Sequence, residues 1–225
     1  MTAVLHSYFR SSTSTRLRVA LNLKQVSYEY VGRNIRAGMQ KAQDYLSIHP
    51  QGLVPALEVD GNKLFQSLAI VEYLEEQFPH PPLLPHDPAG RARVRALALM
   101  IACEVHPLNN LRVLNHIRAV FGANEEQVGE WFRHWVAETF DNLEAYLAAH
   151  SDTGEFCHGD TPTLADICLY AQVLNNQRFN ISSATWPTIA RIFRNCEELE
   201  AFRAAAPAHQ PDADGDARVT NRAAS

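Results

Sequence analysis

Five consecutive hydroxyl residues, Ser11 to Thr15, lie where an apolar run typical of a strand gives way to a run typical of a helix. Serine and threonine are preferred helix N-caps, because their side-chain oxygens accept hydrogen bonds from N–H groups that the first turn leaves unpaired. The same helix end directs spare N–H groups and the positive end of the helix dipole at whatever lies in front. A thiolate bound there would be stabilised, although ordinary capping also explains the cluster taken alone.

Two other short segments could present backbone or hydroxyl groups to a ligand. Val54-Pro55 stands at the mouth of a predicted strand, where a proline is often only a turn residue because it has no N–H to give to the sheet. Gln66-Ser67 follows the next predicted strand and opens a helix, so Ser67 is a candidate helix cap. Capping alone would account for this serine as well.

Cys103, Glu104 and His106 lie close together in the sequence and are the types of residue that bind metals. Zinc needs three or four convergent ligands. These three are few, and on a helix their side chains fan around the axis. We therefore expect no metal site.

The order of the elements that would position these residues indicates a thioredoxin-like α+β domain over residues 1–80. A strand, a helix, a second strand and an irregular helix precede a hairpin and a last helix that begins near Ser67. Asp60-Gly61 is a strong hairpin signal. Six elements in about 80 residues are a normal content for one small domain.

A proline-rich connector at residues 81–88 separates this domain from an all-helical one at 89–206. Prolines make such a segment stiff and extended, and no helix crosses it. A long helical run follows the connector, with a kink expected at Pro107, and residues 125–149 predict a second long helix.

The third helix start in this region is marked by Thr163 and Asp166, which are spaced as in a capping box, with aspartate in place of the usual glutamate. We read this pair as structural. Residues 207–225 are rich in Asp, Ala, Gly and Pro, which predicts a disordered tail.

Composition narrows the function classes. A hydrophobic content of 46% and a charged content of 20% fit a globular protein with a proper core. The net charge of −5 gives no reason to expect nucleic acid or an anionic membrane as partner, and no apolar segment predicts a secretion signal or a membrane span. The four cysteines are widely spaced without a Cys-x-x-Cys pair, which favours reduced thiols in the cytoplasm.

The segment Ser-Ser-Thr-Ser-Thr-Arg-Leu-Arg-Val-Ala-Leu at residues 11–21 resembles the Ser-Ser-Cys-x-x-Arg-Val-Arg-Ile-Ala-Leu signature of zeta-class glutathione transferases. That family includes maleylpyruvate and maleylacetoacetate isomerases. The resemblance extends through most of the chain and includes the His-Pro-Leu-Asn-Asn-x-Arg stretch at residues 106–112. Thr13 replaces the signature cysteine, which puts protein-thiol chemistry at this position in doubt and looks closer to the maleylpyruvate branch.

The resemblance implies glutathione as cofactor and assigns residues to it. The family proline is cis, and the backbone of Val54 would pair with the cysteinyl part of glutathione. The γ-glutamyl carboxylate would bind at Ser67 with help from Gln66, and the hydroxyl cluster would donate hydrogen bonds to the thiolate. The residues that the resemblance places at the cofactor are Ser11, Ser12, Thr13, Gln40, Val54, Pro55, Gln66, Ser67, His106, Asn110 and Arg112.

Arg10, Arg112 and Arg178 match family arginines that face a cleft between the domains. Arginine binds carboxylates bidentately and keeps its proton, so three of them suit a small anionic substrate such as a maleyl diketo acid. We therefore hypothesise a glutathione-dependent cis–trans isomerase in aromatic catabolism, with Ser12, Ser11, Thr13 and the three arginines as its catalytic set. The thiolate would add to the double bond and leave after rotation. Each arginine could instead form an ordinary surface ion pair.

Two other functions stay open at this point. One is a transferase that conjugates or dehalogenates small electrophiles such as α-halo acids, and the other is a transferase-like binding module without turnover. The retained Ser12, Val54-Pro55 and Gln66-Ser67 argue against the binding module. A thioredoxin-type oxidoreductase is disfavoured because no cysteine lies at the first helix start. The resemblance also implies a homodimer.

Overall fold

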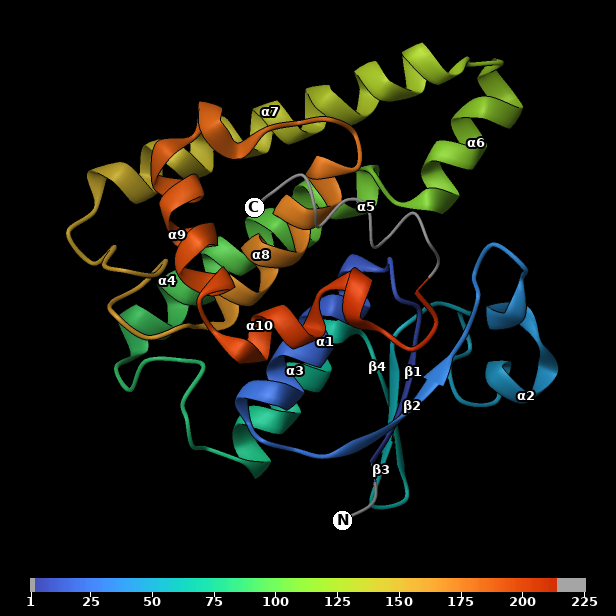
Figure 1. Ribbon diagram of the computed structural model, residues 1–225, viewed down its shortest axis with the longest axis horizontal. Helices are drawn as coiled ribbons and strands as arrows, with labels where there is room; N and C mark the ends of the chain where they lie inside the picture. Colours follow the sequence, from blue (N-terminus) through green and yellow to red (C-terminus); the bar gives the residue numbers. More distant parts are fainter. Residues whose placement is uncertain (1–2, 214–225) are drawn as a thin grey trace. The chain divides into compact units, whose positions relative to one another are not determined.

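A four-stranded sheet forms the centre of the first of two units into which the chain divides (Figure 1). The computed structural model describes residues 3–213. The first unit comprises Met1–Pro82 together with Glu197–Ser225, and the second comprises Leu83–Cys196. The four-stranded mixed sheet with its helices, followed by an all-helical unit, confirms the predicted fold class of a thioredoxin-like α+β domain and an all-α domain.

The sheet has the strand order β2-β1-β3-β4. Its strands are β1 (Ala3–Ser7), β2 (Tyr28–Gly32), β3 (Ala56–Val59) and β4 (Asn62–Phe65). β1 runs parallel to β2, and β3 runs antiparallel to both β1 and β4. Asp60 and Gly61 both have positive φ, at 48° and 80°, which is the backbone of the tight hairpin turn that the Asp-Gly pair predicts.

Helices cover both faces of this sheet. α1 (Ser12–Leu23) and α3 (Ser67–Gln77) pack together on one side, and the short α2 (Gln43–Leu46), preceded by the 3₁₀ turn η1 (Met39–Lys41), lies on the other (Figure 1). The core contains fully buried leucines from a strand and from α1, among them Leu5 and Leu17. α1 begins at Ser12, directly after its cap Ser11, in the hydroxyl cluster where the sequence predicts a helix start.

The second unit is helical throughout. Its elements are α4 (Pro88–Leu99), the π-helix η2 (Met100–Val105), α5 (His106–Leu108), α6 (Leu111–Phe121), α7 (Glu125–Ala149), α8 (Leu164–Gln177), the 3₁₀ turn η3 (Ser183–Thr185) and α9 (Pro187–Glu197). Near Pro107, where the sequence predicts a kink, the type of helix changes: the π-helix η2 ends at Val105, and α5, which contains Pro107, follows directly. A proline ring clashes with the carbonyl four residues earlier, so the regular α-helical hydrogen-bond pattern is interrupted there. The long helix predicted at 125–149 is α7.

The C-terminal segment differs from the predicted division at residue 206. α10 (Glu200–Ala205) and the 3₁₀ turn η4 (Pro207–His209) belong to the first unit, where α10 packs against α1. Phe202 and Ala205 are fully buried, and the Asn22 side-chain amide donates to the Ala201 carbonyl at 2.9 Å. An apolar helix face must cover some partner, and here that partner is α1. Residues 207–213 are ordered into this packing, whereas residues 214–225 lie outside the described residues.

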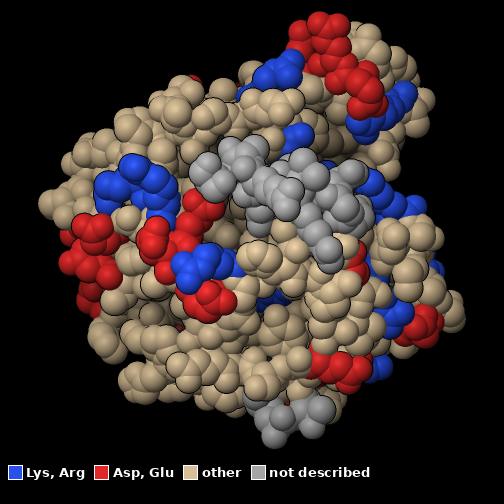
Figure 2. Space-filling model, in the orientation of Figure 1, with Lys and Arg blue, Asp and Glu red and all other residues tan. Residues whose placement is uncertain are grey.

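Surface charge, membrane-spanning helices and metal-binding groups are features that would point to a class of function. On the face in Figure 2, lysine and arginine side chains are interspersed with aspartate and glutamate. No helix in residues 3–213 is long and apolar enough to cross a membrane. Within that same range no group of three or more His, Cys, Asp or Glu side chains could hold a metal ion, and all four cysteines are free.

The capping box at the start of α8 is formed as predicted. The fully buried Asp166 carboxylate accepts from the Thr163 N–H at 2.8 Å, the Thr163 hydroxyl at 2.7 Å and the Cys157 N–H at 2.7 Å. Burial raises the pKa of Asp166, and these hydrogen bonds oppose that shift. One side chain thus fixes both the helix start and the loop that precedes it.

Replacing this carboxylate should destabilise the protein strongly. We expect Asp166→Ala to lower the free energy of unfolding by about 3 kcal/mol or more, because several buried donors lose their acceptor together. Urea denaturation followed by circular dichroism measures this loss in the free energy of unfolding. Asp87→Ala removes the exposed cap of α4, which accepts from the Gly90 N–H, and should cost clearly less. Equal losses for the two variants would contradict this account.

Candidate functional site

The hydroxyl cluster at the start of α1 separates into structural residues and one uncommitted residue. Ser11 is the N-cap, and its oxygen accepts from the Ser14 N–H at 3.2 Å. The Thr13 hydroxyl donates its hydrogen to the Val54 carbonyl at 2.9 Å. It also lies 2.8 Å from the Ser11 hydroxyl, and because the Thr13 hydrogen is already used, Ser11 is the donor in this second bond. Two of the three hydroxyls assigned to a thiolate therefore already donate within the protein.

Ser12 is the exception. Its side chain is 7% exposed, and its hydroxyl makes no hydrogen bond to any other residue between 3 and 213. The N–H groups of Ser12 and Thr13 likewise have no acceptor in that range, because they belong to the first turn of a twelve-residue helix. One hydroxyl and two N–H groups are thus available together at the positive end of a helix dipole. This arrangement can bind an anionic sulfur.

The segment that faces this cluster is the loop containing Val54 and Pro55. The peptide bond between them is cis. The Thr13 bond to the Val54 carbonyl ties this loop to α1, and the Val54 N–H has no acceptor among the described residues. The preceding residue, Leu53, is held by the buried Tyr45, whose hydroxyl donates to the Leu53 carbonyl at 2.5 Å. Burial raises the pKa of Tyr45, so it stays protonated as the donor.

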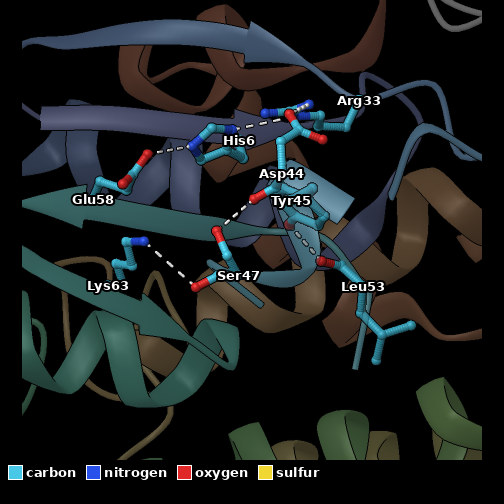
Figure 3. Close-up of polar contacts among 8 residues, drawn as sticks. All are labelled: His6, Arg33, Asp44, Tyr45, Ser47, Leu53, Glu58 and Lys63. Atoms are coloured by element: carbon cyan, nitrogen blue, oxygen red, sulfur yellow. Dashed lines mark hydrogen bonds and ion pairs between the residues drawn. The ribbon is translucent and has the colours of Figure 1, made fainter. Parts of the chain in front are cut away.

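A chain of polar contacts supports Tyr45 from the sheet side (Figure 3). Arg33 donates from Nε to Nδ1 of His6 at 3.3 Å and from Nη1 to Asp44 at 3.0 Å. Because Nδ1 of His6 accepts, its proton belongs on Nε2, which lies 2.8 Å from Glu58. The Arg33 guanidinium also stands 5.0 Å from the centre of the Tyr45 ring. These contacts join β1, β3 and the residue that follows β2 to α2, and they support the loop at Leu53.

The start of α3 offers a second helix end. Gln66 occupies the cap position with φ 69° but makes no side-chain cap bond, since its amide donates instead to Gln51 at 2.9 Å. Ser67 is the first helical residue rather than the cap, which corrects the simple capping interpretation. Its side chain is 5% exposed and, within residues 3–213, makes no hydrogen bond. The Oε1 atom of Gln40, from the loop before α2, is also buried without a partner in the described chain.

The remaining candidates are divided between the two units. Arg10 precedes the hydroxyl cluster in the first unit, with its guanidinium 5.1 Å from the centre of the Phe9 ring. In the second unit, Asn110 caps α6 by accepting from the Arg112 N–H at 3.2 Å. Arg112 is exposed, and Arg178 at the end of α8 donates to Asn175 at 3.1 Å. His106 follows directly on the π-helix. Their roles stay predictions.

Sequence reasoning missed two supporting residues. Arg18 was noted only as part of a signature, but it is fully buried and donates to Phe9, Ser7, Thr15 and Ala205. An arginine inside an otherwise apolar run of a helix was the available signal. Tyr45 gave no signal, because its partner is a carbonyl that only the fold brings near.

The chain is similar to known proteins over nearly its whole length. Residues 1–76 match the family of glutathione S-transferase N-terminal domains. A maleylpyruvate isomerase from Ralstonia is 47% identical, covering 92% of this chain and 98% of its own. A maleylacetoacetate isomerase from Pseudomonas aeruginosa is 45% identical, covering 92% and 97%.

Solved structures give the same result. The holo structure of a maleylpyruvate isomerase, described as a bacterial zeta-class glutathione S-transferase, superposes with a TM-score of 0.92 at 46% identity, covering 94% of this chain and all of that one. A maleylacetoacetate isomerase from Methylobacterium extorquens, with malonate and glutathione bound, gives 0.91 at 39% identity with the same coverage. The chain therefore belongs to the glutathione transferase family, within the zeta class that includes maleylpyruvate and maleylacetoacetate isomerases.

Proposed function

We infer that this protein is a glutathione-dependent cis–trans isomerase of maleyl diketo acids. Relatives named maleylpyruvate or maleylacetoacetate isomerase match it over almost its whole length, and related structures hold glutathione. The observation that carries the inference is the uncommitted Ser12 hydroxyl at the start of α1, beside helix N–H groups that also lack acceptors. We place maleylpyruvate first as substrate, since Thr13 replaces the cysteine of the family signature.

The first unit has the donors that glutathione requires. The thiol of glutathione would bind at Ser12, the backbone of its cysteinyl residue at the Val54 N–H, and its γ-glutamyl carboxylate at Ser67. The buried Oε1 of Gln40, which has no partner in the described residues, would accept from the glycyl N–H of glutathione. When bound, glutathione supplies a thiolate that adds to the substrate double bond and leaves after rotation about the resulting single bond.

We propose that Ser12 donates its hydroxyl hydrogen to the sulfur and so lowers the thiol pKa from its usual value of about 8.5. Thr13 contributes no thiol and instead holds the Val54 loop, while Ser11 holds the helix start. Arg10, Arg112 and Arg178 would bind substrate carboxylates and stabilise the negative charge that develops on the substrate oxygen. His106 and Asn110 keep their predicted roles in binding.

The activity test is the loss of maleylpyruvate absorbance with purified protein, with and without glutathione. We expect glutathione-dependent conversion to fumarylpyruvate, with the glutathione concentration unchanged at the end. Conversion of maleylacetoacetate alone would move the assignment to the other branch. Consumption of glutathione with an α-halo acid, and no isomerisation of either substrate, would instead show a conjugating or dehalogenating transferase.

Substitutions in the hydroxyl cluster should separate chemistry from stability. Ser12→Ala should raise the apparent pKa of the bound thiol and shift the rising limb of the pH–rate profile to higher pH, with little change in stability. Ser11→Ala should lower the free energy of unfolding by about 1 kcal/mol, because it removes the helix cap. The thiol pKa is measured from the thiolate absorbance as a function of pH. The free energy of unfolding is measured by urea denaturation. A bound-thiol pKa in Ser12→Ala equal to that in the native protein would remove Ser12 from its role.

Substitution of a substrate arginine should affect catalysis alone. A contact worth about 3 kcal/mol in the transition state corresponds to roughly a hundredfold, so Arg178→Ala should lower kcat/KM for maleylpyruvate by about that factor. Arg118→Ala is a matched control in the same unit, because Arg118 forms an exposed pair with Glu125 at 2.7 Å. Equal kcat/KM values for the two variants would reject the assignment of Arg178.

We further propose that the protein is a homodimer in the cytoplasm, as the family resemblance implies. Light scattering of the purified protein should give about twice the chain mass of 25.2 kDa. A mass equal to one chain would reject the dimer.

A further inference from the structure

We propose that Asp212, near the C-terminus, is a positioning residue for the thiol site: its carboxylate holds the peptide of Phe9 and thereby fixes the segment that delivers Ser12. We call residues 8–11, which connect β1 to α1, the entry loop. The proposal rests on the proposed function, because it assigns Ser12 to the glutathione sulfur. It adds a residue from the far end of the chain to the support of that site.

The Asp212 carboxylate joins two elements. Its Oδ2 accepts from the Phe9 N–H at 3.2 Å, and its Oδ1 accepts from the Tyr30 hydroxyl at 2.6 Å. Tyr30 lies on β2, so one side chain ties the entry loop to a strand of the sheet. Burial raises the pKa of Tyr30 and the bond to Asp212 adds to the shift, which keeps this tyrosine protonated as a donor.

Asp212 packs closely against the end of β2. A Cβ atom placed on Gly32, at the end of β2, would lie 3.4 Å from both Cβ and Oδ2 of Asp212, which is van der Waals contact. The C-terminal segment therefore approaches the backbone of the strand at contact distance.

Arg18 holds the same residue through its carbonyl. The Nη2 of Arg18 donates to the Phe9 carbonyl at 3.1 Å, and its Nε donates to the Ala205 carbonyl of α10 at 2.9 Å. Phe9 thus has its N–H fixed by Asp212 and its carbonyl fixed by a fully buried arginine. Phe9 and Tyr8 also form a small buried cluster against which Val54 and Ala213 pack. Both backbone groups of Phe9 are therefore bound by the C-terminal segment or by a residue bound to it.

The C-terminal segment is itself fixed where it turns toward the entry loop. The side-chain amide of Gln210 is buried and donates to the carbonyls of Ala204 and Ala206 at 2.8 and 2.9 Å. The Ala213 N–H donates to the Gln210 carbonyl at 3.0 Å. These bonds hold Asp212 in a defined position between them.

Fixing Phe9 also restricts the position of the Ser12 hydroxyl. Phe9 precedes Ser12 by three residues, and a displacement of about 1 Å in a catalytic group can cost a hundredfold in rate. A fixed Phe9 limits the positions of the Ser11 cap and the Ser12 hydroxyl. The role of Asp212 is to keep that hydroxyl pre-positioned before glutathione binds.

The first test uses the protein without glutathione. Amide hydrogen exchange of the full chain should show Phe9 exchanging about tenfold faster in Asp212→Ala than in the native protein, because its N–H loses its acceptor. Asp212→Asn should restore much of the protection, since an amide can accept from Phe9 and donate to the Tyr30 oxygen. Glu76→Ala removes an exposed carboxylate on α3 and should leave Phe9 exchange unchanged. Equal exchange in Asp212→Ala and Glu76→Ala would overturn the proposal.

The second test asks whether the site depends on this contact. In Asp212→Ala we expect the dissociation constant for glutathione to rise several-fold and the pKa of the bound thiol to increase, with Asp212→Asn close to native. Faster exchange with an unchanged affinity and thiol pKa would make Asp212 a purely structural tie and overturn its positioning role. If the native protein fails to bind glutathione, the proposed function fails, and the exchange result still decides whether Asp212 holds Phe9.

Discussion

The buried guanidinium of Arg18 is the constraint on which the first unit depends. A charge removed from water is costly unless it is hydrogen-bonded, so each of its N–H groups needs an acceptor inside the fold. The acceptors come from β1, the entry loop, α1 and α10. Segments from both ends of the chain must therefore meet around one side chain, and the entry loop is fixed between them. An arginine here determines backbone positions as well as charge.

The thiol site follows from how hydrogen-bond donors are shared at the start of α1. The first turn of a helix has N–H groups without acceptors in the helix. Ser11 accepts from one of them, the Ser14 N–H, and the Thr13 hydroxyl is used in its bond to the Val54 carbonyl. What is left over is the Ser12 hydroxyl with two N–H groups. The same side chains that stabilise the helix start thus define which donors remain for a ligand.

The rest of the site is built on the sheet face that α2 covers. The charged chain from Glu58 through His6 and Arg33 to Asp44 places Tyr45 against the Leu53 carbonyl (Figure 3). The Asp44 end is exposed, and the Arg33 contact lowers its pKa, whereas Tyr45 and His6 are buried. These side chains hold the loop at Val54 in place, although in our proposal none of them contacts a ligand.

The sequence by itself determined the type and order of the elements, because period, turn residues and caps are local signals. The Asp60-Gly61 turn, a helix irregularity near Pro107 and the Thr163–Asp166 capping box were all readable from the residues, and the resemblance at residues 11–21 identified the family. Only the tertiary structure decided which hydroxyl is uncommitted, since that depends on the Val54 carbonyl more than forty residues away. It also decided the place of Asp212, whose partners lie at the other end of the chain. The composition of residues 207–213, rich in Asp, Ala and Pro, predicts disorder, but long-range hydrogen bonds, which no local pattern encodes, hold this stretch against the first unit.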